Sequence, residues 1–349
     1  MTKTTINRQK LNKLQKTLED SKTLLIVMQD YPDPDAIAAA SALRQIANAM
    51  AGSSCTLTYS GGIGRSENQA LARYVGLNLR LIDELNPENY DRIAMVDTQP
   101  GTGNNALDID ICPHIVIDHH PIRHATRSVP FTDIRRRYGA TATILYEYLV
   151  EADLKIEVNL ATALVYGIRS DTQDLGREAT QADINAYLAL YPSANKRMLS
   201  RIEHTTVPRA YFQVIAAGLT RATMYGPAII SHLGTVDHPD VMGEVADLLL
   251  RNEESCLALV HGVHKSRLLL SLRTSGDTTD AGRLIQKIVG RQGTGGGHSS
   301  IAGGQIPLED ESNKTLSAHL KRIRDRFLKA ARCGTEKGEP LVDVSLSPS

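Results

Sequence analysis

The sequence predicts an α/β fold of two domains. The first is an N-terminal, doubly wound and mostly parallel sheet with helices on both faces, and the second is a smaller C-terminal α/β domain across a cleft. Along the first half, short apolar runs alternate with longer helical segments, which is the pattern of β-α-β units. The runs are almost continuously apolar, as in strands buried on both faces. With 349 residues, 42% of them hydrophobic, the chain can form two cores of ordinary size.

The N-terminal elements follow from hydrophobic periodicity. Leu11, Leu14 and Leu18 recur at helical spacing in a charged segment and predict an amphipathic helix. Beyond it, four apolar runs indicate strands, and four segments with small or amphipathic residues indicate helices. The expected strands are 24–28, 55–59, 92–96 and 114–117, and the expected helices are 35–50, 66–75, 139–152 and 158–168.

The second half begins with a helical, polar region at 180–222 that Pro192 and Pro208 interrupt, and we expect it to connect the two domains. Three further apolar runs predict strands, two segments predict helices, and turn-forming residues from 334 onward predict a flexible tail. The strands are expected at 227–233, 256–263 and 267–273, and the helices near 280–290 and 314–331. The resulting division is a first domain at 1–190, a connector at 191–222, a second domain at 223–335 and a tail at 336–349.

Composition excludes several kinds of partner. Lys and Arg together number 39, and Asp and Glu also number 39, so overall charge indicates neither a long nucleic-acid duplex nor a membrane surface. There is no run of about 18 apolar residues and no signal-peptide pattern. The four cysteines lie far apart, which argues against a zinc knuckle or a CxxC redox site. We therefore expect a cytoplasmic protein with reduced thiols.

Acids and histidines follow three of the predicted strands. Asp33 and Asp35 come after the first run, Asp97 after the third, and Asp118-His119-His120 after the fourth. Because the carboxyl ends of parallel strands meet at one edge of a sheet, these side chains should lie together there. Crowded carboxylates repel one another and normally require cations.

Each of these acids alone has a simpler interpretation. Asp33 or Asp35 could cap a helix, and Asp97 could belong to a turn in VDTQPG. Their joint occurrence at three strand ends favours a metal site. Mixed Asp and His ligands suit Mn²⁺, Fe²⁺, Co²⁺ or Zn²⁺ better than Ca²⁺.

Six ordered motifs make the sequence resemble the DHH phosphoesterase family with its DHH-associated C-terminal domain. They are Pro32-Asp33-Pro34-Asp35-Ala36, Asp97 in AMVDTQ, Asp118-His119-His120 in VIDHHP, Asp171 in GIRSDTQDL, SLRTSG at 271–276, and Gly295-Gly296-Gly297-His298. On this resemblance the first domain would bind metal and catalyse, and the second would bind substrate.

The resemblance implies two divalent ions, Mn²⁺ in the first place, with Mg²⁺, Co²⁺ and Fe²⁺ as alternatives. Asp97 and Asp171 would bridge both ions, Asp33 would complete one site, and Asp35 with His119 would complete the other. His120 would face the scissile phosphate, and Asp118 would orient the histidines.

The second domain is expected to hold the far end of the substrate. Backbone N–H groups of Gly295, Gly296 and Gly297, followed by a helix start, would form an anion nest. Arg273 and His298 would grip a phosphate there.

Gln29 departs from the family pattern. In the family a histidine usually stands four residues before the leading Asp of the first motif, and it ligates the first metal. A glutamine amide is a poorer ligand for Mn²⁺ than imidazole, so we expect a retained but weakened first site. The alternative is that Gln29 only packs or forms a hydrogen bond.

The implied function is that of a phosphoric ester hydrolase, of the phosphodiesterase or exoribonuclease type, that uses two metals and a metal-activated water. The branch of bifunctional oligoribonucleases and phosphoadenosine-phosphate phosphatases is the most similar. Its substrates would be nanoRNA, linear dinucleotides or 3′-phosphoadenosine 5′-phosphate, and the balanced charge fits a short substrate. The alternatives are a cyclic-dinucleotide phosphodiesterase, a RecJ-like exonuclease, and a nucleotide sensor whose catalysis is weakened by Gln29. A homodimer is the family-level expectation.

Overall fold

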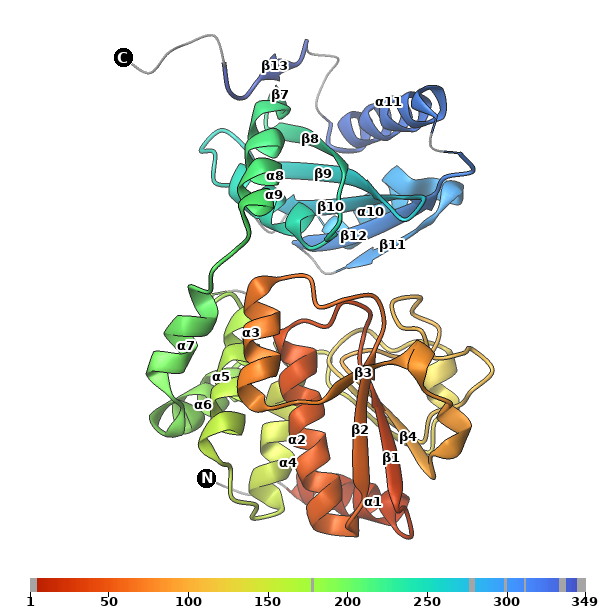
Figure 1. Ribbon diagram of the computed structural model, residues 1–349, viewed down its shortest axis with the longest axis vertical. Helices are drawn as coiled ribbons and strands as arrows, with labels where there is room; N and C mark the ends of the chain where they lie inside the picture. Colours follow the sequence, from red (N-terminus) through yellow and green to blue (C-terminus); the bar gives the residue numbers. More distant parts are fainter. Residues whose placement is uncertain are drawn as a thin grey trace. The chain divides into compact units, whose positions relative to one another are not determined.

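The protein folds as two compact α/β units, Met1–Thr206 and Val207–Ser349 (Figure 1). The computed structural model describes residues 5–176, 179–275, 280–297, 300–310, 312–332 and 337–343. Each unit contains one sheet with packed helices, and the first sheet is parallel throughout. The fold class predicted from the sequence is confirmed.

The first sheet has the strand order β3-β2-β1-β4-β5-β6. The order reverses between β1 and β4, and such a switch point is where open α/β sheets bind ligands. Four of the strands were predicted, whereas the short outer strands β3 and β6 were not. The bounds are β1 Thr23–Val27, β2 Ser54–Tyr59, β3 Leu79–Leu81, β4 Arg92–Val96, β5 Ile115–Asp118 and β6 Phe131–Ile134.

The two faces of this sheet are covered differently. Leu24 and Ile26 of β1 point into a core shared with the α-helices, while Leu25 and Val27 point into a smaller core on the other face. Short 3₁₀ turns and loops cover that second face. We predicted helices on both faces of the sheet, whereas α-helices cover only one of them. The helices are α1 Thr5–Leu18, α2 Pro34–Ala51, α3 Ser66–Val75, α4 Thr141–Glu151, α5 Val158–Asp171, α6 Gln181–Leu190 and α7 Lys196–Glu203. The 3₁₀ turns are η1 Ile82–Glu84, η2 Pro87–Asn89, η3 Ala125–Ser128 and, after α6, η4 Tyr191–Ser193.

Helices α2 and α5 pack unusually close together. A Cβ on Gly167 of α5 would lie 3.0 Å from the backbone oxygen of Pro34 and 3.1 Å from the Cβ of Ala38. The small residues of α2 and the missing side chain at Gly167 therefore permit this approach. It brings the C-terminal end of α5, with Asp171, to the first turn of α2, with Asp35.

The second sheet has the order β11-β12-β10-β9-β8-β7-β13 and is mixed, since β8 and β9 pair in parallel while the other pairs are antiparallel. Residues alternate between two cores, one with α8 and α9 and the other with α10 and α11. The bounds are β7 Thr223–Tyr225, β8 Ala228–Thr235, β9 Leu257–His264, β10 Arg267–Thr274, β11 Thr294–Gly297, β12 Ile301–Pro307, β13 Glu339–Pro340, α8 Arg209–Thr220, α9 Val241–Leu249, α10 Ala281–Val289 and α11 Asn313–Ala330, with η5 at Gly290–Gln292.

Several expectations for the second half are confirmed and one is wrong. The three predicted strands correspond to β8, β9 and β10, and the two predicted helices to α10 and α11. The described residues that follow the glycine run form a strand and not the expected helix start. The run forms strand β11, which pairs with β12, the next described element.

The expected connector, 191–222, is divided between the two units. Its η4 and α7 lie in the first, and α8 lies in the second. In the expected tail, β13 pairs with β7, and the remainder beyond 343 lies outside the described residues. None of the described helices is both long enough and apolar enough to cross a membrane.

Candidate metal centre

The strand ends bring the predicted site residues to one edge of the first sheet. Strands β1, β4 and β5 are neighbours and parallel, so the segments that follow them leave the sheet on the same side. Asp33 and Asp35 begin α2 after β1, Asp97 follows β4, and Asp118 ends β5. Asp97 has a left-handed backbone with φ +58°, a conformation that Asp tolerates better than most residues.

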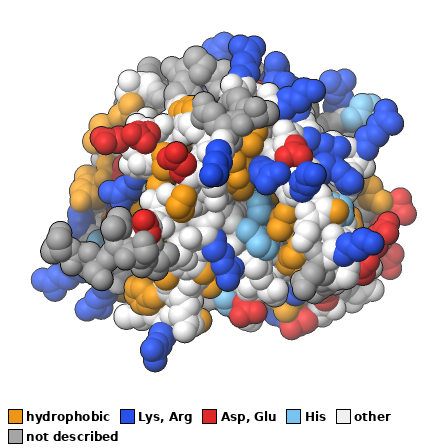
Figure 2. Space-filling model, turned by 90° about the horizontal axis from the view of Figure 1, so that it is seen from above, with side chains coloured by type: hydrophobic (Ala, Val, Ile, Leu, Met, Phe, Trp, Pro, Cys, Tyr) orange, Lys and Arg blue, Asp and Glu red, His pale blue; other side chains and the backbone are white. Residues whose placement is uncertain are grey.

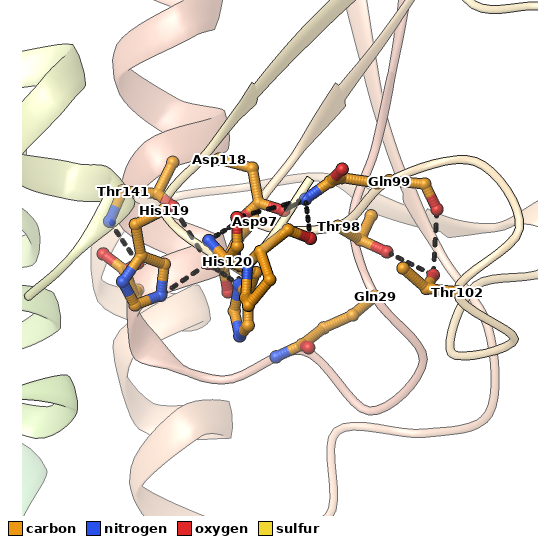
Figure 3. Close-up of polar contacts among 12 residues, drawn as sticks. Gln29, Asp97, Thr98, Gln99, Thr102, Asp118, His119, His120 and Thr141 are labelled. Carbon is orange, nitrogen blue, oxygen red and sulfur yellow. Dashed lines mark hydrogen bonds and ion pairs between the residues drawn. The ribbon is translucent and has the colours of Figure 1, made fainter. Parts of the chain in front are cut away.

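His119 belongs to both groups of possible metal ligands in the cluster, and it lies beside His120 (Figure 3). Its Nε2 is 3.2 Å from Oδ2 of Asp171 and 3.5 Å from Oδ1 of Asp97. One ligand atom each from Asp35, His119 and Asp171 lie within 4.8 Å of one another, and so do atoms from Asp97, Asp118, His119 and His120. The structure thus brings together six of the residues predicted from the sequence.

The orientation of His119 suits a metal ligand. Its Nδ1 is 3.1 Å from the carbonyl oxygen of Tyr138, and since a carbonyl can only accept, Nδ1 carries a hydrogen. Nε2 then faces the carboxylates and can act as the ligand atom, which is the arrangement typical of metal-bound histidine.

The carboxylates at the site oppose one another electrostatically. Burial, followed by the charge of Asp171, raises the pKa of Asp33 to about 6 and that of Asp35 to about 8. Burial and the charges of Asp35 and Asp33 hold the pKa of Asp97 well above its usual range. Bound divalent cations would offset this repulsion, so the donor set of oxygen atoms and one imidazole fits such ions.

Asp33 and Asp35 also have structural partners. Oδ1 of Asp33 accepts a hydrogen bond from the backbone N–H of Ala36 at 2.9 Å and caps α2. Both oxygens of Asp35 accept from the first turn of α4, from the N–H groups of Thr141 at 2.7 Å and Ala142 at 2.8 Å. The capping interpretation of Asp33 therefore holds together with its place beside the cluster.

Asp118 is joined to His120. Its Oδ1 accepts hydrogen bonds from Nδ1 of His120 at 2.7 Å and from the backbone N–H of His120 at 3.0 Å. Burial acts to raise the pKa of Asp118, but the hydrogen bond and the charges of His120 and His119 lower it to about 2. Asp118 is thus an ionised partner that fixes the ring of His120 and leaves Nε2 on the side away from it.

Comparison with known proteins gives the family. Residues 24–168 match the model of the DHH family, N-terminal domain, and residues 226–325 match that of the DHHA1 domain. Together the two matches span well over half of the chain. The chain belongs to the DHH family.

The curated relatives of this DHH-family protein match it over only part of their own length. It is 35% identical over 300 residues to an uncharacterized protein of Methanocaldococcus jannaschii, a match that covers 85% of this chain and 60% of that protein. It is 24% identical over 154 residues to a probable manganese-dependent inorganic pyrophosphatase of Lactococcus lactis, covering 44% of this chain and 49% of the relative. The chain thus spans roughly half of the length of the curated relatives it matches.

Solved structures share the fold of the DHH-family protein. An exopolyphosphatase-related protein from Bacteroides fragilis superimposes with a TM-score of 0.71 at 14% identity, covering 93% of this chain and 98% of that one. RecJ from Thermus thermophilus in complex with Mn²⁺ superimposes with a TM-score of 0.52 at 15% identity, covering 93% of this chain and 55% of RecJ.

Gln29 of the DHH-family protein contacts Asp33. Its Nε2 donates to Oδ2 of Asp33 at 2.8 Å, and its Oε1 accepts from Nδ2 of Asn104 at 3.4 Å. The amide thus presents a donor, not an oxygen ligand, to the carboxylate. This arrangement agrees with the alternative in which Gln29 only forms hydrogen bonds. The weakened first metal site stays a prediction.

In the second unit, Arg273 is buried and bonded within its own unit. Its Nε is 2.7 Å from Oδ1 of Asp247, and its Nη1 donates to Ser271 and to the carbonyl of Leu272. Gly295, Gly296 and Gly297 lie in the outer strand β11, and His298 lies outside the described residues. The roles of these residues in substrate binding stay predictions.

Gln99 is a site residue that the sequence did not reveal. It is fully buried, and its Nε2 donates to Oδ2 of Asp118 at 2.7 Å. Its Oε1 accepts from the backbone N–H of Arg123 and the hydroxyl of Thr126. Gln99 thereby holds both Asp118 and the loop that follows the histidines (Figure 3).

Thr141 is a second such residue, since its Oγ1 donates to Oδ1 of Asp97 at 2.9 Å. For Gln99, the one sequence signal that could have indicated a place in the site is its position two residues after Asp97 in VDTQPG. The contact of Thr141 with Asp97 spans 44 positions and leaves no local pattern.

We expect the metal-free protein to lose stability as the pH rises. The folded state raises the pKa of Asp35 from 3.8 to about 8, and that of His119 from 6.5 to about 10. For Asp35 burial is the main cause. For His119 burial acts in the opposite direction, and the bond with Asp171 outweighs it. Both groups bind protons more tightly when folded, so the free energy of unfolding falls between pH 3.8 and about 10. Asp118, whose pKa is lowered from 3.8 to about 2, is ionised in both states above about pH 5.5 and adds no slope over the range of the experiment below.

Urea unfolding in EDTA at about pH 5.5, 7 and 8.5 measures this slope. Saturating Mn²⁺ should flatten or reverse it, because ligands bind the ion in their deprotonated forms. Asp35→Asn should reduce the slope of the metal-free protein. A midpoint that is independent of pH in EDTA would contradict the expected proton uptake.

Gln29→His is expected to tighten Mn²⁺ binding by roughly 10-fold or more, because imidazole is a better ligand for Mn²⁺ than a neutral amide. Isothermal titration of the metal-free protein measures the affinity directly. Gln69→His, on the surface helix α3, is the matched control and should leave Mn²⁺ affinity unchanged. If Gln29→His shows unchanged Mn²⁺ dependence, the weakened-site interpretation fails.

Proposed function

We propose that this protein is a metal-dependent phosphoesterase that hydrolyses short nucleotide substrates. The preferred substrates are nanoRNA or linear dinucleotides, and 3′-phosphoadenosine 5′-phosphate is a further candidate. The observation that carries the proposal is the convergence of Asp35, Asp97, Asp171 and His119 at the switch point of a parallel sheet. Three relatives that are named as probable manganese-dependent inorganic pyrophosphatases support a metal-dependent hydrolysis at phosphorus.

Asp33, Asp35, Asp97, His119 and Asp171 would hold two divalent ions, Mn²⁺ in the first place. When bound, such ions lower the pKa of a coordinated water and neutralise charge that develops on a phosphoryl group. Asp97 and Asp35 are each fixed by hydrogen bonds from α4, so the chain supplies ligands that need little rearrangement.

His120 and Asp118 would act on the substrate side. Asp118 accepts the Nδ1 hydrogen of His120, so the opposite ring nitrogen is the one directed to a phosphoryl oxygen or the leaving oxygen. Asp118 holds the ring of His120 in place, and His120 would donate a proton to the leaving oxygen. His120 is also the more exposed of the two histidines, at 35% of its side chain against 6% for His119.

A substrate panel tests the proposal. The purified protein is incubated with Mn²⁺ and, separately, with pApA, RNA of two to five nucleotides, a long RNA, a cyclic dinucleotide, 3′-phosphoadenosine 5′-phosphate and pyrophosphate. We expect the highest kcat/KM for pApA and the short RNA, and no turnover in EDTA.

The other outcomes identify the alternatives. Preference for the long RNA would favour a RecJ-like exonuclease, and preference for the cyclic compound a cyclic-dinucleotide phosphodiesterase. Turnover of pyrophosphate alone would agree with the activity named for the pyrophosphatase relatives. Tight binding of a nucleotide without turnover would favour a sensor. A homodimer in solution stays a prediction that light scattering can test.

A further inference from the structure

Asp183 is a buried carboxylate that the metal centre described above does not include. Charged side chains mostly lie at the surface, and Figure 2 shows those of Lys, Arg, Asp and Glu exposed on the face that it views. Asp183, in the first turn of α6, is instead completely buried. A carboxylate is costly to bury unless hydrogen bonds compensate for the loss of water. The hydrogen-bond partners of Asp183 therefore indicate its role.

Four hydrogen bonds from neutral donors hold Asp183. Its Oδ1 accepts from the hydroxyl of Thr143 at 2.6 Å, and its Oδ2 accepts from the backbone N–H of Gly139 at 2.9 Å. Oδ2 also accepts from the N–H of Thr180 at 2.8 Å and from its hydroxyl at 2.7 Å, at the N-terminal end of α6. Asp183 thereby joins α6 to the chain that leads into α4.

Residues 138–143, which we call the supporting segment, also contact the metal centre. The carbonyl of Tyr138 accepts a hydrogen bond from a first candidate ligand. The N–H groups of Thr141 and Ala142 donate to a second, and the hydroxyl of Thr141 donates to a third. In this order, the three ligands are His119, Asp35 and Asp97.

The supporting segment connects Asp183 to these ligands. Its residues that contact ligands are interspersed with those that contact Asp183, so both sets of hydrogen bonds hold one short piece of backbone. Among the described residues, no candidate ligand is a hydrogen-bond partner of Asp183 itself. An effect of Asp183 on the ligands therefore passes through the segment.

Two carboxylates hold the N-terminal end of α4. Asp35 accepts from the N–H groups of its first turn, and Asp183 accepts from the hydroxyl of Thr143 in the same turn. The N-terminal end of a helix carries partial positive charge, which attracts both carboxylates. A ligand and a carboxylate outside the ligand set thus fix the same helix end.

We propose that Asp183 is a positioning residue of the metal centre, which holds the supporting segment where that segment orients His119, Asp35 and Asp97. The proposal rests on metal binding by these ligands, as part of the proposed function, and is independent of the substrate. It gives α6 a part in metal affinity, although α6 carries none of the candidate ligands.

Isothermal titration of the metal-free full chain with Mn²⁺ tests the proposal. Asp183→Ala removes all four bonds and leaves the buried N–H of Gly139 without its acceptor, so the segment can move. The dissociation constant for Mn²⁺ should rise by about 10–100-fold, the usual cost of losing a partner that orients metal ligands. Asp183→Asn should raise it by less than about 3-fold. The Asn oxygen can take the place of Oδ2, and its NH₂ can donate to the hydroxyl oxygen of Thr143.

Thr162→Ala is the control for a loss of stability alone. Thr162 is completely buried in α5, donates to the carbonyl of Val158 at 2.6 Å and accepts from the N–H of Asn195 at 2.9 Å. Urea unfolding in EDTA should show that Thr162→Ala and Asp183→Ala are both destabilised, while only Asp183→Ala loses Mn²⁺ affinity. Unchanged Mn²⁺ affinity in Asp183→Ala, or an equal loss in Thr162→Ala, would leave Asp183 with a structural role and overturn the proposal.

Thr143→Val decides the question if Asp183→Ala does not fold. Val has the shape of Thr without its hydroxyl, so one bond between Asp183 and the segment is lost. The dissociation constant for Mn²⁺ should then rise by about 3–10-fold, and an unchanged constant would overturn the proposal. Absence of Mn²⁺ binding by the unchanged protein would overturn this proposal and the proposed function together. Mn²⁺ binding that Asp183→Ala weakens, without turnover of any nucleotide, would support this proposal and contradict the proposed function alone.

Discussion

Asp97→Asn should lower Mn²⁺-dependent hydrolysis by about 10³-fold or more, because loss of a charged metal ligand costs several kcal/mol of transition-state stabilisation. Asp97 is almost completely buried, and its Oδ1 lies 3.5 Å from Nε2 of His119. Asn keeps the size of the side chain and an oxygen that accepts from Thr141, so the fold should survive. Rates at saturating Mn²⁺, and the rise in melting temperature that Mn²⁺ produces, measure the effect.

Asp133→Asn is the matched control for this experiment. Asp133 is a second buried carboxylate of the first unit, with Arg135, Tyr148 and Lys10 as partners and no place in the metal cluster. Its replacement should lower the melting temperature in the absence of metal yet preserve the shift caused by Mn²⁺. The assigned centre would be rejected if Asp97→Asn hydrolysed substrate as fast as the unchanged protein.

His120→Ala should lower kcat by about 10²–10³-fold, the usual contribution of a positioned proton donor. His120 is fixed by two contacts with Oδ1 of Asp118, at 2.7 and 3.0 Å, and its side chain is more exposed than that of His119. The Mn²⁺-induced rise in melting temperature should be largely retained. Single-turnover rates and thermal shifts, measured on the same preparation, separate the two effects.

Asp118→Asn shows whether Asp118 acts through His120. Alone it should lower kcat by about 10–100-fold, as replacement of a residue that orients a functional side chain commonly does. In the His120→Ala background it should have little further effect, because residues that act as a unit are not additive. Full additivity of the two losses would instead assign Asp118 an independent role.

The sequence predicted the parts of this protein that follow from periodicity and from position along the strands. Continuous apolar runs predicted β1, β4 and β5, and residues just beyond each run predicted the cluster, because parallel strands necessarily bring their carboxyl ends together. The outer strands β3 and β6 were missed because they are short and only partly apolar.

What could not be predicted depends on contacts between distant segments. The bond of Thr141 to Asp97 and the support of Gln99 under Asp118 arise only after the sheet is assembled. The glycine run was misread for a similar reason. A strand of small residues has no hydrophobic alternation, and the pairing of β11 with β12 is a tertiary fact.

The contact between α5 and α2 at Gly167 has a consequence for ion selectivity. Asp171 ends α5 and Asp35 lies in the first turn of α2, so the distance between these carboxylates depends on how near the two backbones come. A methyl group at 167 would press on Pro34 and Ala38 and spread the helices apart. We therefore expect a residue without a side chain, one turn before Asp171 and against the backbone of Asp35, to help set the ionic radius that the centre accommodates.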